Sequence, residues 1–510
     1  MQALEISVEH SPESLAETKF WLTHDGLDDP ALKDLTHLPF VTIDNENSRD
    51  LDQALIIQKN DNGYKVLYAL ADAAYYIRPD SALFAEALQR GTTYYTPLMA
   101  APMLPTELSE GLISLNPDVL RRSLVFDMTL DANAVVTQCQ IVRARIRSQA
   151  KLNYAGVQKW LDTCETDTQP YHQSLRLLRE VGSKLIAASE TRGVIRFNRT
   201  ETHIQVRGTP PHLSASVRSR YDTERYNEQI SLICNMQGSE LLLGFAGVTD
   251  VMQAIFRVHE APLRKNLKQL KDTLDALANI LDDADRWRWQ DGQSLAQYVE
   301  GLPTEPHHAK RVRAIERQIM QAQRGSSFTP EPGEHHALKA ASYARFSSPM
   351  REVVGIFTHK ELLEALHGDK FDNDADHILR EQVIESANAA RQKQRQLDKR
   401  MEFVALQIVF NADLNAEDTP WHTGTIVGMR ADKLYINLDN MALDVKIYRD
   451  DLDNAYSTSY TIGDVRAEAV DQVSPIWTLG QSIQLRVKSF DASRARYMFA
   501  LEAHEEAVRE

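Results

Sequence analysis

The sequence predicts an α+β protein in which a mixed body of strands and helices is followed by a small all-β barrel. Two strand-like segments, 54–59 and 64–70, flank the turn sequence Asn-Asp-Asn-Gly, which predicts a hairpin. Leucines between 263 and 281 repeat at helical spacing, which is typical of a buried helix face. From about residue 421 the chain changes to short strands with turn signals.

A chain of 510 residues leaves room for roughly two to four domains. We expect an N-terminal helical segment at 1–38, a mixed domain at 39–410 and a β-barrel domain at 411–510. The first segment is expected to dock through four apolar residues, Leu15, Phe20, Trp21 and Leu22. The mixed domain should contain a second antiparallel strand pair, 124–130 with 135–146, and a long helix after Tyr221.

The composition is that of an ordinary water-soluble protein, with 43% hydrophobic and 25% charged residues. The net charge of −15 does not favour nucleic-acid binding, although an acidic protein can still enclose a basic channel. Three cysteines, Cys139, Cys164 and Cys234, form neither a disulfide framework nor a zinc motif. The N-terminus has no signal sequence and no apolar run is long enough to span a membrane, so we expect a cytoplasmic protein.

The most informative stretch is VTIDNENSRDLDQA at 41–54, a polar loop between two predicted strands. Asp50 and Asp52 are two residues apart, so in an extended chain their side chains share one face. Asp44 ends the preceding strand and can reach the same place. Three adjacent carboxylates repel one another unless a cation lies between them, and their hard oxygen atoms suit Mg²⁺ or Mn²⁺. The alternative is an ordinary solvated turn; an EF-hand has a different spacing.

These residues resemble the signature of the ribonuclease II / ribonuclease R (RNB-domain) family of 3′-to-5′ exoribonucleases. That family opens its catalytic domain with an Asp, a five-residue gap and then Asp-x-Asp-Asp. Asp44, Asp50 and Asp52 match the first three acidic positions, whereas Gln53 replaces the fourth. The resemblance implies an RNB-type catalytic domain and a C-terminal OB-fold of the S1 type, without the N-terminal cold-shock domains of larger members.

A second block, HHALKAASYARFSSPMREVVGIFTHK at 335–360, resembles the family pattern His-x-Gly-Leu followed by Tyr-x-x-Phe-Thr-Ser-Pro-Ile-Arg-Arg-Tyr-x-Asp. Its most informative matches are His335, Tyr343 and Arg351. Arg351 is expected to bind the scissile phosphate through its planar guanidinium. The block departs plainly from the pattern at Ala337, Glu352, Val353 and Gly355.

The resemblance also implies an RNA-binding surface. Tyr95 and Phe197 would stack on bases at the 3′ end, Tyr154 would lie near the active site, and Glu228 would bind the terminal ribose. Ring stacking holds single-stranded RNA without regard to sequence, and contacts with ribose hydroxyls distinguish RNA from DNA. For Tyr95 the alternative is an ordinary packed side chain.

A basic strand, RARIRSQAK at 143–151, would place arginines 143, 145 and 147 on one side, either as a phosphate track or as a solvated face.

The function implied by the resemblance is metal-dependent hydrolysis of single-stranded RNA from its 3′ end, with release of nucleoside 5′-monophosphates. Mg²⁺, or Mn²⁺, would be held by Asp44, Asp50, Asp52 and Gln53, with Asp52 and Arg351 as catalytic residues and Tyr343 and His335 as further RNA contacts. We expect a monomer with no DNA or membrane partner. Gln53 weakens the metal site, so three hypotheses remain: a weak nuclease or one specialised for short RNAs, an inactive RNA-binding relative, and an interaction scaffold.

Overall fold

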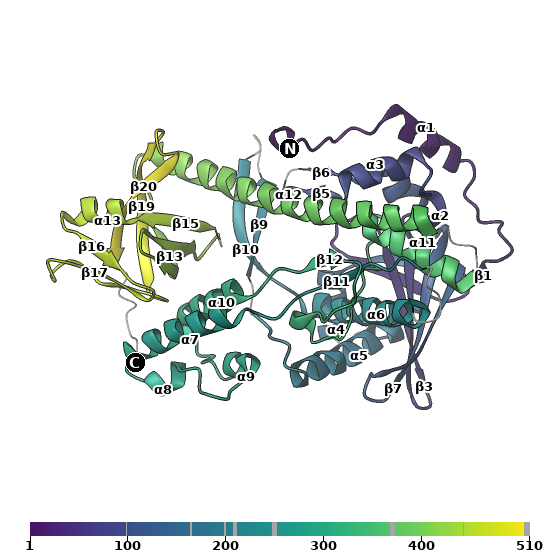
Figure 1. The fold of residues 1–510 in the computed structure, drawn as a ribbon, viewed down its shortest axis with the longest axis horizontal. Coiled ribbons are helices and arrows are strands. Elements are labelled where there is room, and N and C mark those ends of the chain that lie inside the picture. Colours follow the sequence, from purple (N-terminus) through teal and green to yellow (C-terminus); the bar gives the residue numbers. More distant parts are fainter. Residues whose placement is uncertain are drawn as a thin grey trace. The chain divides into compact units, whose positions relative to one another are not determined.

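The computed structural model describes residues 1–97, 99–163, 166–197, 200–207, 212–246, 252–367, 373–441 and 443–503 (Figure 1). The chain forms two compact units. The first unit comprises Met1–Arg192, Arg220–Glu260 and Ser326–Leu397; the second comprises Gly193–Ser219, Ala261–Gly325 and Asp398–Glu510. The domain boundaries expected from the sequence, at 38 and 410, stay a prediction.

The first unit is built on a six-stranded sheet of order β1-β8-β2-β3-β4-β7. Its strands are β1 (Lys33–Asp34), β2 (Phe40–Asp44), β3 (Gln53–Asn60), β4 (Gly63–Ala71), β7 (Leu120–Asp131) and β8 (Val136–Asn153). The long β8 pairs antiparallel with β7 through 136–147 and parallel with β2 through 148–153. The edge strands of the β2-β3-β4-β7 ladder are β2 and β7, and β8 pairs with both of them. The two predicted hairpins, β3–β4 and β7–β8, are confirmed.

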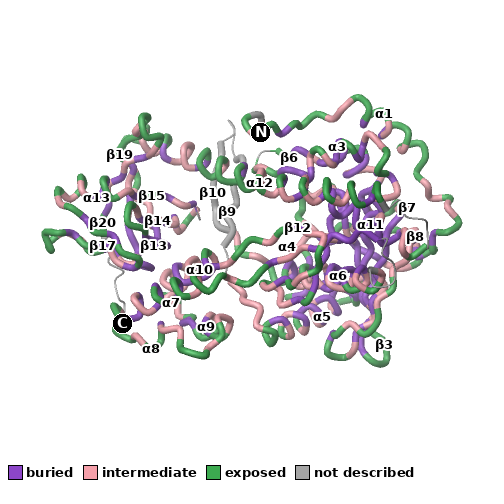
Figure 2. Tube along the Cα trace, in the orientation of Figure 1, coloured by how far each residue is buried: buried purple, intermediate pink, exposed green. Residues whose placement is uncertain are grey.

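Alternation along the strands sends successive apolar side chains to opposite faces of the sheet, and each face carries its own core. Leu55, Ile57 and Tyr68 pack on the side of α4 (Tyr154–Thr163), α5 (His172–Thr191) and α6 (Asp222–Ala246). Ala54, Ile56 and Leu67 pack on the side of the other helices. These are α2 (Ala73–Tyr76), α3 (Ala82–Arg90), α11 (Val353–His367) and α12 (Asn373–Leu414). Figure 2 shows the buried residues of this region in purple.

Several short elements complete the first unit. They are η1 (Gln2–Leu4), α1 (Pro12–Trp21), β5 (Tyr94–Tyr95), β6 (Ala100–Ala101), η2 (Glu107–Leu112), β11 (Phe256–Val258), β12 (Ser327–Thr329) and η4 (His336–Leu338). The expected apolar docking face of the N-terminal segment is wrong. Only Trp21 packs on the core, whereas Phe20 is 51% exposed and Leu15 and Leu22 are also exposed. Helix α1 instead buries Ser14, whose hydroxyl donates to the Ala82 carbonyl at 3.2 Å.

The second unit contains the predicted C-terminal β-barrel. Its main sheet has the order β15-β14-β13-β19-β20 and a smaller one the order β16-β17-β18, around a core that includes the fully buried Trp477. The strands are β13 (His422–Arg430), β14 (Lys433–Leu438), β15 (Asp444–Tyr448), β16 (Tyr460–Ile462), β17 (Arg466–Ala469), β18 (Trp477–Thr478), β19 (Ser482–Asp491) and β20 (Arg496–Ala503), with helix α13 (Arg449–Tyr456). The α+β fold class with a C-terminal all-β region is confirmed.

The rest of the second unit is a β-hairpin and a helical cluster. The hairpin is β9 (Thr200–Arg207) with β10 (His212–Ser219). The cluster consists of α7 (Arg264–Asn279), α8 (Ala284–Trp287), α9 (Leu295–Glu300), η3 (Pro306–His308) and α10 (Ala309–Ala322). Leu270, Leu274 and Leu277 of α7 are buried, as their spacing predicted. Helix α10 is tied to the barrel by Arg313, which contacts Asp439 at 3.0 Å.

Within the described residues, no helix is long and apolar enough to cross a membrane. Cys139 and Cys234 are free thiols, and Cys164 lies outside the described residues.

Candidate functional site

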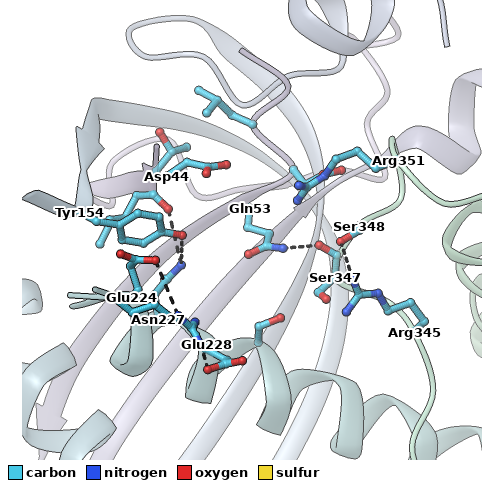
Figure 3. Close-up of a pocket in the computed structure, with 16 residues that line it drawn as sticks. Asp44, Gln53, Tyr154, Glu224, Asn227, Glu228, Arg345, Ser347, Ser348 and Arg351 are labelled. Atoms are coloured by element: carbon cyan, nitrogen blue, oxygen red, sulfur yellow. Dashed lines mark hydrogen bonds and ion pairs between the residues drawn. The ribbon is translucent and has the colours of Figure 1, made fainter. Parts of the chain in front are cut away.

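A cavity of about 230 Å³ opens in the first unit, where both sequence blocks meet (Figure 3). It is bounded by the end of β2, the start of β3, the first half of α6 and the turn before α11. Its lining residues are Thr42, Ile43, Asp44, Leu51, Asp52, Gln53, Tyr154, Arg220, Glu224, Asn227, Glu228, Ser231, Arg345, Ser347, Ser348 and Arg351. Nearly all of them are polar, so the cavity suits a charged ligand better than an apolar one.

Asp52 and Arg351 form the central ion pair of the cavity. Arg351 Nε lies 2.5 Å from Asp52 Oδ2, and the Met350 backbone N–H donates to Asp52 Oδ1 at 2.9 Å. The Asp52 side chain is 1% exposed. Burial raises its pKa to about 6, although Arg351 and the Met350 N–H act in the opposite direction. The pKa of Arg351 is lowered by burial but raised more by Asp52 and its neighbours, so this guanidinium stays charged.

The other two aspartates of the acidic loop lie at different positions. Asp44 ends β2 and lines the cavity, where its Oδ1 accepts from the Asn45 N–H at 2.7 Å. Asp50 lies outside the lining and is 4.0 Å from Arg351 Nε. The Tyr95 hydroxyl donates to Asp50 Oδ2 at 3.1 Å, while the Tyr95 residue remains 44% exposed. Tyr95 therefore presents a partly open ring beside the acidic loop.

Gln53 is held at both ends of its side-chain amide. Its Nε2 donates to the Ser347 carbonyl, and its Oε1 accepts from the Tyr68 hydroxyl. The amide thus bridges the acidic loop and the turn that precedes Arg351. The carbonyl oxygen predicted as a metal ligand is already used as a hydrogen-bond acceptor within the protein.

The turn that carries Arg351 is fixed from two sides. Asn235 of α6 accepts from the backbone N–H groups of Phe346 and Ser347 at 2.8 and 3.1 Å. On the other side, Gly355 of α11 lies against the turn, because a Cβ at residue 355 would be 2.9 Å from Pro349 Cα. Where the family pattern has an aspartate, this chain therefore has no space for a side chain in the present backbone.

The α6 side of the cavity carries a row of charges at helical spacing. Arg220 lies 3.8 Å from Glu224 and 3.2 Å from Glu228. Tyr154, at the start of α4, accepts a hydrogen bond from Asn227 at 3.4 Å, and burial raises its pKa to about 12. Figure 3 shows Glu228 and Tyr154 on the side of the cavity opposite Arg351.

Of the site residues predicted from the sequence, six line the cavity: Asp44, Asp52, Gln53, Tyr154, Glu228 and Arg351. Tyr343 lies behind it, 2% exposed, with its hydroxyl accepting from Asn235 at 2.9 Å. His335 is also buried, and Phe197 packs on the helical cluster of the second unit. The RNA-contact roles of these three residues stay predictions.

Sequence reasoning missed Arg345, Glu224 and Arg220. Glu224 and Glu228 are one turn apart on α6 and Arg220 lies two residues before the helix; their spacing of four was the available signal. Arg345 lies inside the second matched block, at a variable position of the pattern. The predicted phosphate track on β8 is not supported, because Arg143 contacts Asp72 at 3.2 Å and Arg145 contacts Asp34 at 3.6 Å.

Divalent cations favour carboxylate oxygens, but the acidic loop does not gather its own into one site. Among the described residues, three acidic side chains with oxygens within 4.8 Å of one another occur at Glu361, Glu364 and Asp376. There the Lys360 ammonium already contacts all three at 2.7–2.8 Å. In the loop, Asp52 is paired with Arg351 and Gln53 is hydrogen-bonded at both ends. The residues in this arrangement do not fit a bound Mg²⁺ or Mn²⁺.

The chain is similar to the members of one known protein family. Residues 32–368 match the family described as RNB domain. Ribonuclease R of Escherichia coli (strain K12) is 26% identical over 487 residues, which are 93% of this chain and 58% of that relative. The chain spans less than two thirds of the length of the curated relatives that it matches.

Two solved structures share the fold. Ribonuclease R of Mycoplasma genitalium, in complex with ribose methylated single-stranded RNA, matches with a TM-score of 0.85 and 19% identity over 98% of this chain and 76% of that one. Yeast Ssd1, described as a pseudonuclease, matches with a TM-score of 0.63 and 13% identity over 90% and 53%. Because the family match covers more than half of the chain and contains both sequence blocks, the resemblance is confirmed, and the chain belongs to the RNB-domain family.

Proposed function

We propose that this protein is a 3′-to-5′ exoribonuclease that hydrolyses single-stranded RNA to nucleoside 5′-monophosphates. The observation that carries the proposal is the buried Asp52–Arg351 pair at the meeting point of the two family blocks. Family membership and the names of the relatives support it. A cytoplasmic monomer without DNA or membrane partners stays a prediction.

In the proposed reaction, a phosphodiester at the 3′ end replaces Asp52 as the partner of Arg351. The guanidinium then holds two phosphate oxygens and stabilises the charge that develops on them. Asp52, released from the pair, accepts a proton from water as the water oxygen forms a bond to phosphorus. The bond from phosphorus to the 3′ oxygen of the preceding nucleotide breaks, and that oxygen takes a proton from solvent to become the new 3′ hydroxyl. The terminal nucleoside 5′-monophosphate then leaves, and Asp52 returns its proton to solvent. In the free protein, where it is paired with Arg351, this carboxyl has a pKa of about 6, so it is largely ionised at neutral pH and available as a base when RNA binds.

The α6 side of the cavity suits the terminal ribose. Glu228 is a carboxylate that can accept hydrogen bonds from the 2′ and 3′ hydroxyls, which would favour RNA over DNA. Arg220, which also lines the cavity, pairs with Glu228. We therefore assign the 3′-terminal nucleotide to the space between α6 and the Arg351 turn.

A divalent cation remains the cofactor that the resemblance implies, with Mg²⁺ the ion to test first and Mn²⁺ the second. The pairing of Asp52 and the two hydrogen bonds of Gln53 oppose a preformed site. The same observations favour the second candidate function, an RNA-binding protein on the same fold that does not cleave.

The deciding experiment uses single-stranded RNA labelled at its 5′ end, in lengths from short to long, with Mg²⁺, with Mn²⁺ and with EDTA. A ladder that shortens from the 3′ end and is lost in Asp52→Asn supports the nuclease. RNA that is bound but uncut under every condition, including with the native chain, would leave the binding protein as the function.

A further inference from the structure

A second group of positive charges lies next to the cavity and has no role in the reaction above. Arg257, at β11, and Arg391, on α12, both donate to the hydroxyl of Ser326, at 3.2 and 3.0 Å. Their guanidinium carbons lie 5.9 and 5.7 Å from the ring centre of Phe328. Two like charges are therefore held against the same hydroxyl and the same ring.

One carboxylate serves this group. Glu352 contacts Arg345 through two hydrogen bonds, Nε to Oε2 at 3.2 Å and Nη2 to Oε1 at 3.1 Å. In the part of the chain that the structure describes, no ion pair joins Arg257 or Arg391 to a carboxylate. Three guanidiniums thus share a single negative charge, an excess of two positive charges in half-buried positions.

Burial and the neighbouring charges together shift the pKa values of this group. Burial and then Arg345 lower the pKa of Arg257, and burial, Arg257 and Arg395 lower the pKa of Arg391 to about 10. Burial raises the pKa of Glu352, but Arg345 and Arg257 lower it more, so the carboxylate stays ionised. Neighbouring cations of this kind are stabilised by a further anion, and guanidiniums prefer phosphate or carboxylate oxygens.

Arg345 connects the group to the cavity. Arg345 lines the cavity, and its Nη2 donates to Ser348 Oγ at 3.2 Å, three residues before Arg351 (Figure 3). If the scissile phosphate lies at Arg351 and the 3′ nucleotide at α6, the next phosphate along the strand is on the 5′ side. Arg345 is the nearest lining residue of the arginine group to meet it.

We infer that Arg257, Arg345 and Arg391 form a second phosphate subsite for the RNA backbone, with Glu352 as an internal counter-ion that an RNA phosphate displaces. This inference rests on the proposed function, because it takes RNA as the ligand. It also gives a role to Glu352, where the family pattern has an arginine. The chain carries an anion at this position that competes with the strand, so Glu352 lowers affinity for RNA.

The test measures binding of 5′-labelled single-stranded RNA by fluorescence anisotropy in EDTA, over a series of salt concentrations. Arg391→Gln should weaken binding several-fold and reduce the slope of log K against log salt by about 0.7, the value of one phosphate contact on a single strand. Glu352→Gln should strengthen binding several-fold. The matched controls are Arg380→Gln and Glu381→Gln on the same helix, two residues that already pair with each other.

A second measurement is independent of RNA. Thermal unfolding with inorganic phosphate should show a larger rise in Tm for Glu352→Gln than for the native chain, and this rise should disappear in Glu352→Gln with Arg391→Gln. An unchanged salt slope in Arg391→Gln, or weaker RNA binding by folded Glu352→Gln, would overturn the subsite. If RNA binds with the expected salt dependence in each variant but is never cut, the nuclease proposal fails and the phosphate subsite stands. If the native chain binds no RNA, the proposed function fails and the phosphate-dependent Tm decides the anion site.

Discussion

The two ends of the cavity differ in how their charges are balanced. At the acidic loop, Asp52 is paired with Arg351 and hydrogen-bonded to a backbone N–H, and Asp50 accepts from Tyr95. At the arginine group, Glu352 pairs with Arg345, and Arg257 and Arg391 donate to the Ser326 hydroxyl instead of a carboxylate. The acidic end is therefore satisfied within the protein, whereas the basic end has positive charge left for a ligand. The contrast favours an anionic ligand at the basic end over a cation at the acidic end.

The largest expected effect comes from breaking the satisfied end. Asp52→Asn removes the proposed base and leaves Arg351 without its partner, so the rate of RNA cleavage should fall by about 10² to 10⁴-fold. Single-turnover cleavage of a labelled RNA measures this. RNA binding in EDTA should be retained, because the variant loses a negative charge from a site that receives phosphate. An Asp52→Asn protein that cleaves normally would show that another group activates the water.

The pH dependence tests the same end. Because burial raises the pKa of Asp52 from 3.8 to about 6, kcat/KM should fall by about tenfold per pH unit below pH 6. The folded state binds this proton more tightly than the unfolded state, so the Asp52 contribution to the free energy of unfolding falls as pH rises between 3.8 and about 6. Protonation of Asp52 at low pH is therefore expected to lower the activity without unfolding the protein. Circular dichroism at each pH should then show an unchanged spectrum. A rate that is flat from pH 5 to 8 would contradict the base role.

Tyr95, hydrogen-bonded to Asp50 at the acidic end, is the ring predicted to stack on an RNA base. Tyr95→Ala should weaken RNA binding by about 1–3 kcal/mol, the contribution of one stacked base, and leave longer end products. Tyr95→Phe is the matched control, since it keeps the ring and loses only the hydrogen bond to Asp50. If Phe behaves like Ala, the hydroxyl matters and stacking does not.

The smallest effect on chemistry is expected at Gln53. Gln53→Asp shortens the side chain and breaks the bridge between Tyr68 and Ser347, so the free energy of unfolding should fall by about 1–3 kcal/mol. The concentration of Mg²⁺ or Mn²⁺ that gives half of the maximal cleavage should stay the same, because Gln53 is not a metal ligand in this arrangement. Gln58→Asp, at an exposed position of the same strand, is the control. A variant that cleaves at markedly lower metal concentration would place residue 53 in a metal site.

Local patterns predicted the sheet well because their signals are short-range. The turn at residues 60–63 and the alternation around it set β3 and β4 to within one residue. The pairing of Asp52 with Arg351 depended on the resemblance, since no local pattern relates segments so far apart in the chain. Helix α1 was predicted poorly because its apolar residues suggested a docking face, whereas Ser14 and Thr18 are the residues that the fold buries. The arginine group could not be predicted, because its members come from three separate segments that the tertiary fold brings together.

The close approach of Gly355 to Pro349 has a consequence for how this sequence can change. Any side chain at residue 355 displaces the turn, and the turn is also held by Gln53 through the Ser347 carbonyl. Substitutions at 53 and 355 are therefore epistatic: either one alone disturbs the turn, while a matched pair can settle it in a new position. Double-mutant cycles that combine changes at 53 and 355 should therefore give a coupling free energy different from zero.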